Sequence, residues 1–183
     1  IPRKLFTPEA YANFSHVDIN IPIGNSQHML MPSIEAKMLQ ALNIQLNENI
    51  LVVGSGTGYL SSCVSLLGNK VHSIDIDDNL VKISKKNSNQ DFLKGNILYE
   101  NLDLIKNLAI IKKYNVVILT SSIDDLSLIT DHMNNQSRAF IFFGEKIAPV
   151  KTGFLIKKLK TLGLSKEYIS ETDVSHLIVE KND

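Results

Sequence analysis

Residues 50–59 read ILVVGSGTGY, and this stretch decides the fold. Its first part, 50–53, is a continuous apolar run rich in β-branched residues, which is typical of a strand buried on both faces of a parallel sheet. Gly54 ends the run abruptly, and the apolar stretch over 57–67 predicts a helix that stops at Gly68. A buried strand, a glycine turn and a helix in this order are typical of the first unit of an α/β fold.

The alternation of short apolar runs with amphipathic stretches continues along the chain in both directions. It predicts a doubly wound, mostly parallel α/β sheet, because strands that alternate with helices pair in parallel. The predicted strands after the first cover 71–76, 91–94, 116–119, 139–143, 152–159 and 168–179, the last two as a hairpin-like pair. The predicted helices cover 32–42, with proline at the first position, and begin near Asp77 and Asp124, whose carboxylates suit helix starts.

The front of the chain follows a different pattern. Residues 1–31 are rich in proline, glycine and asparagine and have few periodic apolar positions, so we expect an irregular lead-in with one helical turn over 8–11. No linker or repeat divides the rest. We therefore expect residues 1–183 to form a single domain.

The composition excludes several classes of protein. Nineteen basic residues balance nineteen acidic ones, so no net field favours nucleic acid or an anionic membrane. The single cysteine, Cys63, rules out an internal disulfide, and the five histidines lack the spacing of a metal site. No apolar run approaches the roughly twenty residues that span a bilayer, and no signal peptide is visible, so we expect a cytoplasmic protein. Nothing in the sequence fixes an oligomeric state.

The glycine loop narrows the choice of ligand. A phosphate loop needs Gly-Lys-Ser or Gly-Lys-Thr, which is absent, and a dinucleotide fingerprint needs a third glycine where Tyr59 stands. The spacing present, G-x-G-x-G, is typical of S-adenosylmethionine enzymes, whose ligand brings a carboxylate to the helix start. Asp75 falls at the end of the second predicted strand, where a carboxylate accepts hydrogen bonds from ribose hydroxyls.

Three ordered blocks resemble the protein-L-isoaspartate O-methyltransferases. They are IPRKLFTP (1–8), IPIGNSQHMLMP (21–32) and ILVVGSGTGY (50–59), and the likeness is clear to about residue 120. It implies a seven-stranded sheet of the Rossmann-like methyltransferase type. It also implies S-adenosylmethionine as cofactor and methyl transfer to the carboxylate of isoaspartyl residues in proteins or peptides, the first step of their repair.

The resemblance implies a cofactor site and no catalytic side chain, because a carboxylate nucleophile is already ionised at neutral pH. The expected cofactor-binding residues are Gln27, His28, Gly54, Ser55, Gly56, Asp75, Ile76, Gly95 and Asn96. Thr120, Ser121 and Ser122, after the fourth predicted strand, are expected to line the site.

Three positions depart from the family pattern. The serine of its Q-T-I-S segment falls on Leu30, the acid of V-L-E-I-G falls on Val52, and the aspartate of a Gly-Asp pair falls on Asn96. These changes keep open an alternative, a catalytically silent member that uses the fold for binding or regulation. A nicotinamide-dependent oxidoreductase is a third interpretation, disfavoured by Tyr59.

Overall fold

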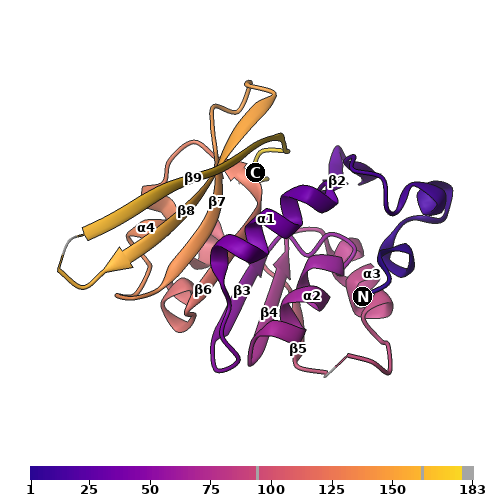
Figure 1. The fold of residues 1–183 in the computed structure, drawn as a ribbon, viewed down its shortest axis with the longest axis horizontal. Coiled ribbons are helices and arrows are strands. Elements are labelled where there is room, and N and C mark those ends of the chain that lie inside the picture. The colour runs from indigo at the N-terminus through magenta and orange to yellow at the C-terminus, as the bar shows by residue number, and fades with distance from the viewer. Residues whose placement is uncertain (94, 162, 179–183) are drawn as a thin grey trace.

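The computed structural model describes residues 1–93, 95–161 and 163–178, and it confirms the predicted α/β architecture (Figure 1). Seven strands form one sheet in the order β5-β4-β3-β6-β7-β8-β9. The strands are β3 (Asn49–Val53), β4 (Lys70–Asp75), β5 (Ile97–Asn101), β6 (Val116–Ile123), β7 (Arg138–Phe143), β8 (Val150–Leu159) and β9 (Gly163–Asp173). Neighbours pair in parallel from β5 to β7, and β8 is antiparallel to both β7 and β9.

The sheet is sandwiched between two apolar layers. Side chains that alternate along β3 divide between them: Ile50 and Val52 join one cluster, and Leu51 and Val53 join the other. The first layer is completed by α1 (Pro32–Leu42) and α2 (Tyr59–Leu67), and the second by η3 (Ile105–Lys113) and α4 (Ser127–Thr130). The helix α3 (Asp78–Asn87) packs against β4 and β5. Burial on both faces explains why β3 is apolar throughout.

The predicted irregular lead-in proves to be more ordered. It holds η1 (Arg3–Phe6), η2 (Glu9–Phe14) and a two-stranded antiparallel sheet of β1 (Ile21–Gly24) and β2 (Gln27–Met29). The hairpin turns at Asn25 and Ser26, both with positive φ, as tight hairpin turns require. Phe6, Ile21 and Met29 form a small core of their own, so this segment packs as a unit.

Two elements near the middle of the chain differ from their predicted position or length. The sequence predicts the third strand at 91–94, but residues 91–93 form a turn, and residue 94 lies outside the described residues. The strand is β5, which begins at Ile97 and therefore follows Gly95 and Asn96. The helix predicted near Asp124 is a single turn, in which Asp125 Oδ1 accepts from the Ser127 amide at 2.9 Å.

The last hairpin is confirmed with different bounds. β9 begins at Gly163 and ends at Asp173, several residues earlier than predicted at each end. Residue 179, the predicted end, lies outside the described residues. After β9 the chain turns back alongside the end of β6, where His176 forms a parallel bridge with Ser122.

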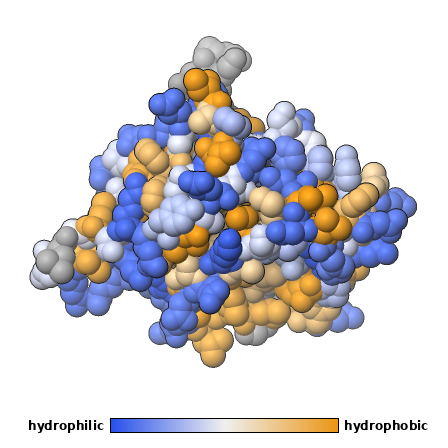
Figure 2. All heavy atoms as spheres, turned by 45° about the horizontal axis from the view of Figure 1, so that its top comes forward, coloured by the Kyte–Doolittle hydropathy of each residue, from blue (hydrophilic) through white to orange (hydrophobic). Residues whose placement is uncertain are grey.

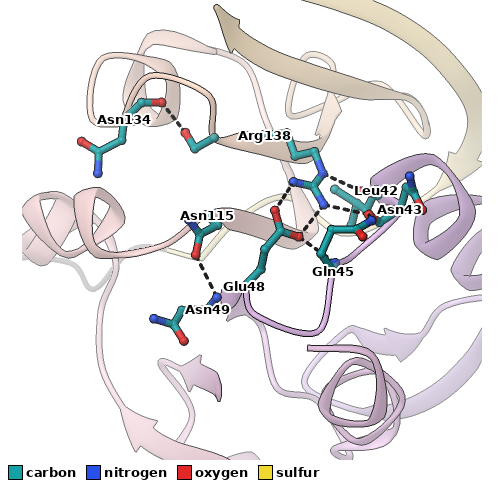
Figure 3. Close-up of polar contacts among 9 residues, drawn as sticks. Leu42, Asn43, Gln45, Glu48, Asn49, Asn115, Asn134 and Arg138 are labelled. Carbon is teal, nitrogen blue, oxygen red and sulfur yellow. Dashed lines mark hydrogen bonds and ion pairs between the residues drawn. The ribbon is translucent and has the colours of Figure 1, made fainter. Parts of the chain in front are cut away.

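Arg138 joins three segments at the amino ends of the strands (Figure 3). Its guanidinium donates to both carboxylate oxygens of Glu48, at 2.6 and 2.7 Å, and to the Asn43 carbonyl at 3.0 Å. A planar fork that binds a carboxylate twice also fixes its orientation. The end of α1, the start of β3 and the start of β7 are thereby fixed together, at the opposite edge from the glycine loop.

Candidate functional site

The glycine loop joins β3 to α2 by a sharply turned backbone. Gly54 has a φ of +91°, and its amide donates to the Ile74 carbonyl of β4 at 2.8 Å. A Cβ at this position would lie 2.1 Å from Thr120 Oγ1. Only glycine meets both the backbone conformation and the close approach of β6.

Side chains from two other elements, β6 and α3, hold the loop in place. Thr120 Oγ1 donates toward the carbonyls of Val53 and Gly54, each at 3.0 Å. Ser84 of α3 donates to the Gly56 carbonyl, and Asn87 donates to the Thr57 carbonyl, both at 3.0 Å. The loop is therefore fixed before any ligand binds, which lowers the entropic cost of binding.

Asp75, the last residue of β4, lies under the loop. Its Oδ2 accepts from the Gly56 amide at 3.1 Å and from Ser55 Oγ at 3.2 Å, and its Oδ1 accepts from the Asp77 amide at 3.1 Å. Burial raises the pKa of Asp75 above its ordinary value, against the opposing effect of these hydrogen bonds. Asp75 thus organises the loop and faces the cavity beside it.

The cavity has a volume of about 350 Å³ and lies over the carboxyl ends of the parallel strands, where ligands bind in open α/β sheets. Its floor comes from the ends of β3, β4 and β6 and from the residues after β5. Its roof comes from the β1–β2 hairpin and from residues 176–178. The lining residues used below are Gln27, His28, Gly54, Gly56, Asp75, Ile76, Asp77, Asp103, Thr120, Ser121 and His176.

Asp103 is a lining residue that the sequence analysis missed. It follows β5 and is 9% exposed. Its Oδ1 accepts from the Ile105 amide at 2.8 Å, whereas Oδ2 is buried and has no hydrogen-bond partner among the described residues. A buried carboxylate oxygen without a partner is costly, so it points to a ligand that donates to it. The sequence signal, an acid just after a strand, was hidden because the strand was predicted too early.

The predicted site residues separate into two groups. Gln27, His28, Gly54, Gly56, Asp75 and Ile76 line the cavity, and Ser55 lines a smaller adjoining pocket of about 30 Å³. Gly95 and Asn96 do not line it, which corrects their predicted place. They precede β5, and Asn96 Nδ2 donates to the carbonyls of Ser65 and Asn69, at 3.0 and 2.8 Å.

Leu30 and Val52, the two apolar departures from the family pattern, are both buried in one cluster. Leu30 is 4% exposed and Val52 is fully buried, and both belong to the layer formed with α1 and α2. Leu30 also lines the smaller pocket, beside Glu35 and Tyr59. Apolar packing therefore occupies the two positions at which the family pattern has polar groups.

A buried ion pair lies beneath that smaller pocket. Arg3 pairs with Glu35 of α1, donates to the Leu30 carbonyl at 2.5 Å, and lies over the Tyr59 ring at 4.7 Å. Burial raises the pKa of Glu35 to about 7, although Arg3 opposes the shift. Through this pair the lead-in segment is fixed to α1 and to the start of α2.

Solved structures resemble this fold over nearly the whole chain. A Plasmodium falciparum structure assigned to protein-L-isoaspartate O-methyltransferase, in complex with S-adenosyl-L-homocysteine, aligns with a TM-score of 0.79 and 18% identity. That alignment covers 96% of this chain and 85% of the other. Another protein-L-isoaspartate O-methyltransferase aligns with a TM-score of 0.81 and 21% identity over 98% of this chain and 59% of the other. At these identities the likeness establishes the fold.

Sequence relatives carry the same name. Protein-L-isoaspartate O-methyltransferase of Dictyoglomus thermophilum is 35% identical over 86 residues, which are 47% of this chain and 39% of the relative. The enzyme of Methanospirillum hungatei is 31% identical over 122 residues, 67% of this chain and 56% of the relative. The matched regions thus span between about two fifths and just over half of these relatives.

The family model described as protein-L-isoaspartate(D-aspartate) O-methyltransferase matches residues 1–131. This match includes all three sequence blocks, the glycine loop, Asp75 and Asp103. The chain therefore belongs to the protein-L-isoaspartate(D-aspartate) O-methyltransferase family.

Proposed function

We propose that this chain binds S-adenosylmethionine in the cavity and transfers its methyl group to the side-chain-derived carboxylate of isoaspartyl residues in proteins or peptides. The observation that carries the proposal is the cavity itself. A rigid glycine loop, Asp75 and Asp103 meet there at the carboxyl ends of adjacent strands. The family match and the relatives' names support the same reaction.

The residues present fit this cofactor. Two of the buried polar atoms without a partner among the described residues are available to it: Asp103 Oδ2 at the cavity and Thr57 Oγ1 at the adjoining pocket. Asp75 would accept from the ribose hydroxyls, and Asp103 would accept from a donor at the adenine. The cavity volume is within the range of small-molecule sites. When bound, the cofactor supplies an activated methyl group.

The chain's own contribution is alignment and exclusion of water. The acceptor carboxylate needs no general base, because its ordinary pKa of roughly 4 leaves it ionised at neutral pH. Holding the reacting atoms in line contributes about 7–11 kcal/mol to lowering the barrier. Residues of the β1–β2 hairpin and residues 176–178 line the cavity and would keep water from part of a bound ligand.

A second candidate function is binding without catalysis. The observation that favours it is the apolar packing of Leu30 and Val52. The absence of a polar side chain at each of these positions would weaken ligand binding by about 0.5–1.5 kcal/mol. The silent alternative expects a pocket that is either empty or blocked by apolar side chains, and the open volume of about 350 Å³ argues only against blocking.

Isothermal titration with S-adenosylmethionine and S-adenosylhomocysteine, followed by methylation assays, tests the proposal. We expect micromolar binding of both, and methyl transfer to a peptide with one isoaspartyl residue but not to its normal aspartyl counterpart. Binding without transfer would favour the silent alternative. No binding of either ligand at millimolar concentration would refute the proposed cofactor.

No helix among the described residues has both the length and the apolar character to cross a membrane. The cytoplasmic location and the role in protein repair, both expected from the sequence, stay predictions.

A further inference from the structure

The end of β6 presents three consecutive hydroxyl side chains, and only some of them are engaged. Thr120 Oγ1 is committed to the carbonyls of Val53 and Gly54. Ser121 lines the cavity, is 7% exposed, and its buried Oγ has no hydrogen-bond partner among the described residues. A buried hydroxyl without a partner costs free energy, and a ligand oxygen in the cavity would satisfy it.

His176 lies beside these hydroxyl side chains, and the backbone of the segment after β9 is hydrogen-bonded to Ser122. The Ser122 amide donates to the Ser175 carbonyl at 2.9 Å, and the Leu177 amide donates to the Ser122 carbonyl at 2.8 Å. The imidazole Nδ1 lies 3.2 Å from Ser122 Oγ. His176 lines the cavity, and its Nε2 has no partner among the described residues.

The protonation of His176 suits a hydrogen bond to a ligand. Burial lowers the pKa of His176; Asp124 opposes this effect, and Lys151 and Lys146 add to it. A neutral ring that accepts from Ser122 Oγ at Nδ1 carries its proton on Nε2 and can donate it to an oxygen.

Charges of both signs lie near His176: the exposed acid Asp124 and two lysines, Lys146 and Lys151. Asp75, Asp77 and Asp103 gather where the cofactor's hydroxyl and amino groups are expected. The side chain of Lys151 is buried near His176. Its ammonium donates to the Glu145 carbonyl and has no carboxylate partner among the described residues. A buried cation without a counter-ion favours a nearby anion.

We infer that Ser121 Oγ and His176 Nε2 position the carboxylate of the methyl acceptor. The buried ammonium of Lys151, which is not itself a lining residue, attracts this carboxylate. This inference rests on the proposed function and supplies the polar contact that Leu30 cannot make. One carboxylate oxygen accepts from the two side chains while the other forms the new bond to the methyl carbon. The bond between that carbon and sulfur breaks with its electron pair left on sulfur, and no proton moves.

The test separates acceptor binding from cofactor binding. The variants are Ser121→Ala, His176→Phe and the conservative Ser121→Thr. Ser170→Ala is the matched control, because Ser170 Oγ is also buried without a partner among the described residues but lies on β9 away from the cavity. The readouts are the KM and kcat for an isoaspartyl peptide at saturating S-adenosylmethionine, and the Kd of S-adenosylhomocysteine by titration.

We expect Ser121→Ala and His176→Phe each to raise the peptide KM by about tenfold, since hydrogen bonds to charged groups contribute roughly 1.5–3 kcal/mol. The Kd of S-adenosylhomocysteine should stay within about twofold. Ser121→Thr should restore KM, and Ser170→Ala should change neither value. An unchanged KM in an active enzyme would overturn this inference alone, as would an equal loss of cofactor affinity. A wild-type chain that binds neither ligand nor peptide would overturn the proposed function and this inference together.

Discussion

At the scale of single residues, Asp75 has two tasks, and one substitution removes both. Its carboxylate accepts from Gly56, Ser55 and Asp77, and it borders the cavity. We expect Asp75→Ala to weaken S-adenosylhomocysteine binding at least several-fold, because the loop loses its support and the ribose loses an acceptor. Titration calorimetry measures this change. Asp78→Ala is the control, since Asp78 is an exposed acid whose partner is Lys82 on the surface of α3. Equal affinity in Asp75→Ala and the wild type would remove Asp75 from the site.

Glu35 predicts a pH dependence of stability. Its pKa is raised from 4.5 in the unfolded chain to about 7 in the folded one, so the folded state binds the proton more tightly. The contribution of Glu35 to the free energy of unfolding therefore falls as the pH rises from about 4.5 to 7. Glu35→Gln removes this titration.

Urea unfolding of the wild type and Glu35→Gln at several pH values between 4.5 and 7.5 checks the sign. The wild type should lose stability relative to the variant as the pH rises, although the variant leaves Arg3 without its counter-ion. Groups that titrate in both proteins cancel in the difference. Parallel stability curves across this window would show that Glu35 does not titrate there.

At the scale of elements, the loop between β3 and α2 depends on the space at Gly54. A Cβ there would lie 2.1 Å from Thr120 Oγ1, in a backbone with a φ of +91°. Gly95 also has a positive φ, +66°, but has nothing within 4 Å of its position for a Cβ. Both glycines therefore have a positive φ, but only Gly54 lacks the space for a Cβ atom.

We expect Gly54→Ala to destabilise the fold by about 1–3 kcal/mol and to weaken S-adenosylhomocysteine binding at least tenfold, because Thr120 must leave the loop. Gly95→Ala should cost about 1–2 kcal/mol from strain alone and leave the affinity unchanged. Denaturant unfolding and titration of both variants measure these effects. A loss of affinity in Gly95→Ala would return that residue to the site.

The sequence predicted the elements whose local signals agree with one another. The helix α1 has the predicted bounds, because proline begins it and Asn43 ends it in a left-handed conformation. The strands β3, β6 and β7 were found because both of their faces are buried, which leaves long apolar runs. β5 is an edge strand with Leu98 and Glu100 exposed, so no such run marks it.

The presence or absence of a local sequence signal also explains which residues of the site were not predicted. Residues next to the confirmed strands, such as Gly54 and Asp75, were placed at the cavity by the sequence. Asp103 was missed because it follows the misplaced β5. His176 was missed because it fell inside the predicted strand 168–179, whereas β9 ends at Asp173 and His176 lies in the segment after it. The hairpin of β1 and β2 depends on contacts with Phe6 and Tyr59 that no local pattern reveals.

At the scale of the whole molecule, ligand binding should stabilise the fold as a unit. The cavity joins the lead-in hairpin, the central strands and the segment after β9, so a ligand contacts elements from the whole chain. A ligand at 100 times its Kd contributes about 2.7 kcal/mol. For a chain of this size that corresponds to a rise in Tm of about 5–11 °C.

Thermal unfolding with and without S-adenosylhomocysteine, followed by circular dichroism, measures the shift. The control ligand is adenosine, which lacks the amino acid portion and should shift Tm less. An unchanged Tm at a concentration well above the calorimetric Kd would mean that binding is not linked to global unfolding.

On the face of the molecule in Figure 2, apolar side chains lie in separate groups among hydrophilic ones.

The roof of the cavity is joined across almost the full length of the chain. Asn20 donates to the Asp173 carbonyl at 2.8 Å, and Ser175 Oγ donates to the Ser26 carbonyl at 2.7 Å. During synthesis the lead-in hairpin and the strands β3 to β7 are made before the residues at 173–178 that complete the roof. Contacts between such distant segments form slowly. Closure of the cavity therefore waits for residues 173–178, and a nascent chain stopped before residue 173 would carry the glycine loop beneath a cavity still open on one side.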